Sequence, residues 1–106
     1  MPDIAIVLTT FPADPDGAKA FARTLVDERL AACVNVQAPM TSIYRWEGAV
    51  EEALEHQLTI KTTTNHVADV IARIQELHPY DVPEILVLPV ADGGEAYLRW
   101  IKEMTG

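Results

Sequence analysis

The chain has 106 residues, 49% of them apolar, and a formal net charge of −8 from 16 acidic and 8 basic residues. This length fits a single domain spanning residues 1–106, and the apolar content is too high for a disordered chain. An acidic surface repels phosphate groups and anionic lipids, so the composition argues against nucleic-acid and membrane binding.

Cysteine content and the first residues bear on location. Cys33 is the only cysteine, so the chain cannot form an internal disulfide, which favours a reducing compartment. The segment 1–8 has no basic stretch and no long apolar run, which argues against a signal peptide and a membrane span. We therefore expect a cytoplasmic protein.

The chain opens with a strand pattern and a helix pattern. Residues 4–8 form an almost wholly apolar run, which predicts a buried central strand. Asp14 and Pro15 then have the pattern of an N-cap followed by the first helical residue. Apolar residues continue at helical spacing, which predicts a helix over 15–32.

A second strand is predicted to begin at Cys33. Pro39 interrupts it, which indicates a bulge or an edge position, and the strand pattern resumes over 41–46. Glu47 and Gly48 then form a turn signal.

Residues 50–63 fit two structures. The glutamate-rich segment 51–55 favours a helix by propensity. Alternation in steps of two favours a strand instead, because it gathers apolar residues and a histidine on one face: Val50, Leu54, His56, Leu58 and Ile60. We predict one long strand, paired with 41–46 through the turn.

The rest of the chain predicts two helices and a strand. A helix capped by Thr64 or Asn65 is predicted to stop near Leu77, because His78 precedes a proline. Residues 85–88 predict a buried strand that Pro89 ends. A short terminal helix follows, with its apolar face formed by Tyr97, Leu98, Ile101 and Met104.

The predicted order is β-α-β-β-α-β plus a helix, which is the ferredoxin-like α+β plan with a long central hairpin. The hairpin strands, 33–46 and 50–63, exceed the usual length of about 3–10 residues. Such a hairpin would expose its outer edge, so we predict an oligomer in which another copy covers it. The alternative is a bent hairpin that folds back on its own sheet.

Several segments resemble the CutA divalent-cation tolerance family in order and spacing. The most specific are Ser42 to Gly48 and His78 to Ile85, and the others are 7–10, 29–35, Glu55, 60–62 and 97–101. The resemblance implies a ferredoxin-like homotrimer similar in architecture to the PII signalling proteins. It also implies a link to tolerance of copper and other divalent metal ions.

The resemblance bears on metal binding as well. Copper-binding members can carry a cysteine at the position of Thr9 and a second histidine at that of Leu77, and of this set only His78 is present. His78, Cys33 and Glu84 are the candidate metal ligands, since imidazole and thiolate bind copper and zinc. The alternatives are a histidine bonded to backbone groups and a buried, inert cysteine.

Carboxylates supply a second candidate site. Glu51, Glu52 and Glu55 could bind a hard cation, or they form a solvated acidic edge. The family pattern further implies an intersubunit cleft built from Glu55, Lys61, Tyr80 and Glu84, for which the alternative is a set of structural ion pairs. Trp46 and Trp100 are predicted to be packing or interface residues.

No nucleophile, phosphate loop or dinucleotide motif occurs, so we predict no enzyme. Three hypotheses remain: a metal-responsive trimer, a PII-like trimer that binds small molecules, and a structural assembly protein. No organic cofactor is indicated.

Overall fold

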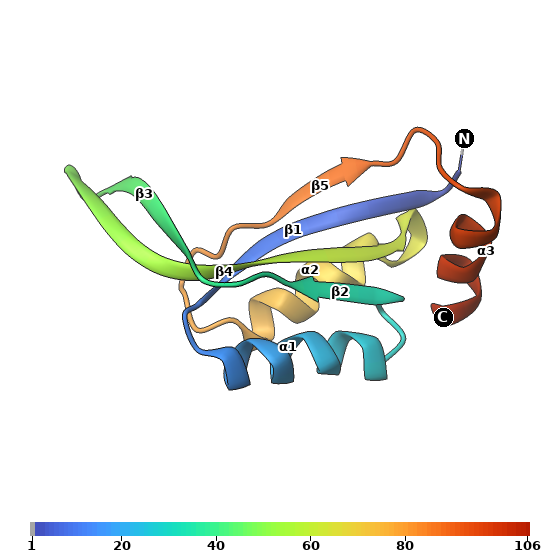
Figure 1. Cartoon of the computed structure of the whole chain (residues 1–106), viewed down its shortest axis with the longest axis horizontal. Coiled ribbons are helices and arrows are strands. Elements are labelled where there is room, and N and C mark those ends of the chain that lie inside the picture. Colours follow the sequence, from blue (N-terminus) through green and yellow to red (C-terminus); the bar gives the residue numbers. More distant parts are fainter. Residues whose placement is uncertain (1) are drawn as a thin grey trace.

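The computed structural model describes residues 2–106, and its elements follow the predicted order (Figure 1). The strands are β1 (Ile4–Pro12), β2 (Cys33–Val36), β3 (Met40–Trp46), β4 (Ala49–Thr63) and β5 (Leu86–Pro89). The helices are α1 (Pro15–Asp27), α2 (Val67–Leu77) and α3 (Glu95–Met104), with a 3₁₀ turn η1 (Thr64–His66) before α2.

The strands form one antiparallel sheet in the order β2-β4-β1-β5, and β3 pairs with the other half of β4. Figure 1 shows α1 and α2 side by side under one face of the sheet, with α3 at the end opposite the hairpin. This arrangement confirms the predicted ferredoxin-like α+β plan. Among residues 2–106, no helix is both long and apolar enough to cross a bilayer.

The main core lies between the sheet and its two covering helices. Val7 of β1 lies opposite Ile60 of β4, and both pack with Leu25 of α1 and Ile74 of α2 in one fully buried cluster. Burying an aliphatic side chain of this size contributes roughly 1.5–3 kcal/mol. This cluster therefore holds the helices against the sheet.

The structure resolves the ambiguity over residues 50–63 in favour of a strand of 15 residues. The second half of β4 lies between β1 and β2, and there His56, Leu58 and Ile60 are buried. In the first half, Val50 and Leu54 are 64% and 60% exposed, as expected for a hairpin that extends past the sheet. That half pairs only with β3, in the hairpin that projects beyond the sheet (Figure 1).

The first helix ends at Asp27, so the prediction that it continues to residue 32 is wrong. Arg29 has a φ of 60°, in the left-handed region, which a continuing helix does not allow. The amides of Leu30 and Ala31 both donate to the carbonyl of Leu25, which turns the chain toward β2. The predicted N-cap is confirmed, because the Asp14 carboxylate accepts from the amide of Gly17 at 3.1 Å.

Three smaller predictions are also corrected. The strand predicted over 4–8 continues to Pro12, because β4 is long enough to pair with all of it. The second helix lacks a side-chain cap from Thr64 or Asn65, since both lie inside η1. The last strand is Leu86–Pro89 and is exposed, because β5 is an edge strand that pairs only with β1.

Candidate functional site

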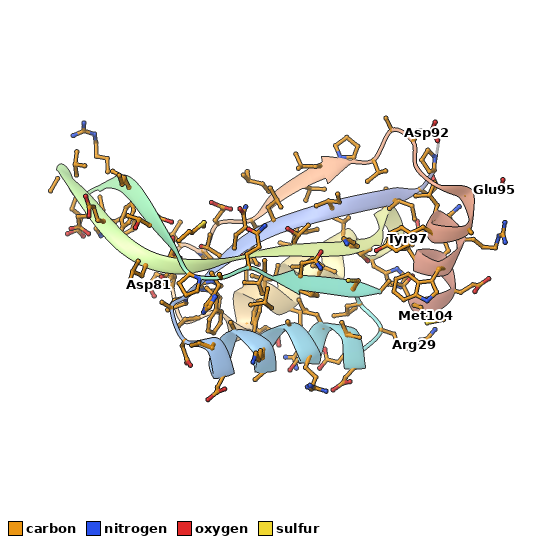
Figure 2. All side chains as sticks on the ribbon, viewed as in Figure 1. Arg29, Asp81, Asp92, Glu95, Tyr97 and Met104 are labelled. Carbon is orange, nitrogen blue, oxygen red and sulfur yellow. The ribbon has the colours of Figure 1, made fainter. Side chains whose placement is uncertain are left out.

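A groove of about 930 Å³ lies where the hairpin leaves the sheet. One wall is the loop of residues 79–84, here called the groove loop, and the opposite wall comes from β3 and β4. Figure 2 shows Asp81 of this loop beside the base of the hairpin. The side chains that give the groove its chemistry are Tyr44, Trp46, Glu51, Glu55, Tyr80, Asp81 and Glu84.

The groove is acidic and aromatic. Four of its lining residues carry a carboxylate, and the described residues around it include no lysine, arginine or histidine. Tyr44 and Trp46 are 40% and 47% exposed, so their rings are available to a bound molecule. Carboxylates attract cations, and the faces of aromatic rings also interact favourably with them. The groove of a single chain therefore favours a bound cation over a phosphate.

Glu55 and Tyr80 meet across the groove. The Tyr80 hydroxyl donates to Oε2 of Glu55 at 3.0 Å, and Glu55 is only 7% exposed. Partial burial of Tyr80, which remains 38% exposed, followed by the hydrogen bond and the charge of Glu55, raises its pKa to about 12. Tyr80 is therefore a hydrogen-bond donor to Glu55 at neutral pH. Burial of Glu55 corrects the predicted solvated acidic edge, which describes only Glu51 and Glu52.

His78 is buried beneath the groove loop, at 7% exposure. Its Nε2 lies 2.6 Å from the carbonyl oxygen of Thr10, and its Nδ1 accepts from the amide of Tyr80 at 3.1 Å. The ring packs edge-on against Phe11 and Phe21. Both ring nitrogens are thus engaged by backbone groups of the same chain.

The structure brings together three of the four residues implied for the cleft: Glu55, Tyr80 and Glu84. Lys61 is six residues further along β4, about 20 Å away at roughly 3.3 Å per residue. Its ammonium lies 5.6 Å from the ring centre of Tyr97 on α3. Figure 2 shows Tyr97 at the end of the molecule opposite Asp81. Lys61 can therefore join this groove only from another copy.

The three predicted metal ligands lie apart within one chain. Glu84 lines the groove, His78 is buried behind it, and Cys33 lies opposite Lys61 at the far end of the sheet. Cys33 is a half-buried free thiol rather than the buried cysteine considered above. Across residues 2–106, no three His, Cys, Asp or Glu side chains converge to hold a metal ion. A single chain therefore does not fit a bound metal, and metal binding by these residues stays a prediction.

Sequence reasoning did not place Tyr44 or Trp46 in the groove. Both lie on the predicted hairpin, so their proximity to each other was foreseeable. Their approach to residues 79–84 was not foreseeable from the sequence, because it depends on the direction in which the chain continues after α2. Trp100, predicted to be a packing or interface residue, stacks on Tyr97 with ring centres 5.5 Å apart and remains 37% exposed.

A family model described as "CutA1 divalent ion tolerance protein" matches residues 5–104. The chain belongs to the CutA1 family. It is 50% identical over 101 residues to the divalent-cation tolerance protein CutA of Thermus thermophilus, and the match covers 95% of this chain and 97% of that protein. The predicted resemblance is confirmed.

Solved CutA1 structures share the fold. The divalent cation tolerance protein of Thermus thermophilus superposes with a TM-score of 0.93 at 48% identity, covering 97% of this chain and 99% of that one. A CutA protein of Archaeoglobus fulgidus, described as periplasmic, gives a TM-score of 0.90 at 33% identity, covering 95% and 97%.

Proposed function

We propose that this CutA1 protein is a non-enzymatic homotrimer that binds copper or a similar divalent cation in the groove, where copies meet. The observation that carries the proposal is the lining of the groove, which places Glu51, Glu55, Asp81 and Glu84 around one space without a basic side chain from the described residues. Carboxylate oxygens are the ligands that hard divalent ions such as Mg²⁺, Ca²⁺ and Mn²⁺ prefer, and copper is the ion that the family resemblance adds.

Exposed apolar side chains support association. Leu86 and Leu88 of β5 are 55% and 46% exposed. They lie opposite Leu8 and Ile6 of β1, on the sheet face away from α1 and α2. Together with the projecting hairpin, they form an apolar surface that a second copy would cover. The number three comes from the family resemblance, since dimers are the commonest oligomers.

A junction between copies would also complete the ligand set. Within residues 2–106 no ion pair joins the buried carboxylate of Glu55 to a basic side chain. A divalent cation, or Lys61 of a second copy, would neutralise this charge, which is costly to bury alone. The proposal therefore places the cation site between copies rather than within one.

The second candidate function is a PII-like trimer that binds a small molecule. The groove volume and its aromatic residues favour it, because small-molecule sites are concave and rich in such side chains. The four carboxylates favour a cationic molecule over a nucleotide, unless Lys61 of another copy enters the groove. Thermal-shift screening would separate the two functions, since a response to metabolites and none to metals supports the second.

Native mass spectrometry and calorimetry with Cu²⁺ test the first function. We expect a mass of three chains, and at least tenfold weaker Cu²⁺ binding in Glu55→Gln and Glu84→Gln. The matched control is Glu52→Gln, because Glu52 is exposed on the same strand but does not line the groove. Equal affinity in all four proteins would refute the groove as the cation site.

The proposed location is the cytoplasm, following the sequence. The Archaeoglobus relative is described as periplasmic, so fractionation of cells producing the full chain is the direct test.

A further inference from the structure

The groove loop makes few hydrogen bonds to the rest of the chain. It has no regular secondary structure, yet it supplies one whole wall of the groove. Within residues 2–106, the only hydrogen bonds made by residues 79–84 are the two from Tyr80: its amide donates to His78 Nδ1 and its hydroxyl donates to Glu55 Oε2. The position of this wall therefore depends on one residue held at two points.

The two partners of His78 define its protonation state. The carbonyl oxygen of Thr10 can only accept, so Nε2 must carry the hydrogen. The amide of Tyr80 can only donate, so Nδ1 must present a lone pair. The ring is therefore a neutral imidazole with its hydrogen on Nε2. The contacts with Phe11 and Phe21 fix the plane in which both nitrogens point.

We infer that His78 is a positioning residue, which ties the groove loop to β1 and aims the Tyr80 hydroxyl at Glu55, and that its imidazole does not ligate metal. This inference concerns how the wall of the proposed groove is held in place, and it rests on that function for its biological meaning. A metal at Nδ1 would have to displace the Tyr80 amide, and a metal at Nε2 the Thr10 carbonyl. Either displacement would break one of the two hydrogen bonds that hold the His78 ring in place.

Two substitutions distinguish the hydrogen bond from His78 to Thr10 from the hydrogen bond that His78 accepts from Tyr80. His78→Asn places an amide oxygen near the position of Nδ1, so it can still accept from Tyr80 but cannot reach Thr10. His78→Gln places its amide nitrogen near the position of Nε2, so it can still donate to Thr10 but offers Tyr80 no acceptor. A residue that merely fills space would respond similarly to both changes, because each removes part of the ring.

Hydrogen-exchange NMR compares these variants. We expect the Tyr80 amide to exchange on the order of fivefold faster in His78→Gln than in His78→Asn, since only the former loses the acceptor. The variant His78→Gln should also be non-additive with Tyr80→Phe, because both release the same loop. Equal exchange of the Tyr80 amide in the two His78 variants would overturn the positioning role.

NMR of histidine-labelled wild-type protein tests the inference without any substitution. We expect the His78 ring to show hydrogen on Nε2 alone, and to keep this pattern of nitrogen resonances on titration with Zn²⁺, a diamagnetic probe. A large Zn²⁺-dependent shift of a ring nitrogen, of the size that direct coordination produces, would overturn the inference. Failure of the proposed function would be seen separately, in the Cu²⁺ affinities of the Glu55 and Glu84 variants, while the His78 spectrum stayed as expected.

Discussion

Tyr80 reaches across the groove to Glu55, its hydroxyl lying 3.0 Å from a carboxylate oxygen 25 residues earlier in the chain. This bond joins an irregular loop to a strand of the central sheet. Partial burial of the ring is the largest cause of the raised pKa of Tyr80, and this hydrogen bond raises that pKa further.

The first prediction concerns this bond at high pH. Because the folded pKa of Tyr80, about 12, exceeds the usual value of about 10, the folded state holds the proton more tightly. Stability is therefore intact below pH of about 10 and falls as the pH rises toward about 12.

The variant Glu55→Gln tests the contribution of the carboxylate. Its Tyr80 pKa should be lower than in wild type but still above the usual value for tyrosine, since partial burial is the larger cause of the rise. Ultraviolet titration of the phenols, with Tyr80→Phe as the reference, checks this; an unchanged titration would contradict it.

The second prediction concerns the ion pair that joins α1 to α2. Arg73 donates to both carboxylate oxygens of Glu28, at 2.9 and 2.7 Å. These hydrogen bonds lower the pKa of Glu28 and raise that of Arg73. The resulting stability is present above the ordinary pKa of glutamate and is lost as the pH falls through the lowered folded value.

Thermal unfolding across acidic pH checks the ion pair. Glu28→Gln should have a flatter stability profile than wild type, and high salt should narrow the difference because the pair is partly exposed. Glu52→Gln is the control, since Glu52 makes no ion pair among the described residues. Parallel profiles for wild type and Glu28→Gln would refute the prediction.

The third prediction concerns the tip of the hairpin. Glu47 and Gly48 have φ values of 49° and 81°, which define a type I′ turn between β3 and β4. A side chain at Gly48 would meet nothing within 4 Å, so its only cost is backbone strain. Gly48→Ala should lower the free energy of unfolding by roughly 1–2 kcal/mol. Glu47→Asn should raise it slightly, because asparagine tolerates this conformation. Chemical denaturation measures both, and a stabilising Gly48→Ala would contradict the assigned turn.

The fourth prediction concerns the exposed leucines of β5. Leu86→Glu and Leu88→Glu should shift the assembly toward single chains, because each places a charge on the face that a second copy would cover. Light scattering measures the mass. Val26→Glu is the control, since Val26 is 39% exposed but lies on α1, across the sheet from this face. The surface would be wrongly assigned if all three variants kept the wild-type mass.

Much of the fold follows from local patterns. The α2 helix ends at Leu77 because Pro79 restricts His78, and α1 begins after the Asp14 cap; neither feature depends on distant parts of the chain. The boundaries that local patterns missed depend on contacts far apart in the sequence. The end of α1 is one example, since Arg29 in its left-handed conformation donates to the carbonyl of Glu103 on α3.

For the site, the sequence by itself determined which residues have suitable chemistry, because side-chain type fixes what can bind a cation or donate a hydrogen bond. It could not determine which of them meet. Only the tertiary structure joined Glu55 to Tyr80, separated Lys61 and Cys33 from both, and engaged both nitrogens of His78. The physical reason is that β4 is long and extended. Residues a few positions apart on it lie in different parts of the molecule, whereas the loop after α2 folds back onto its middle.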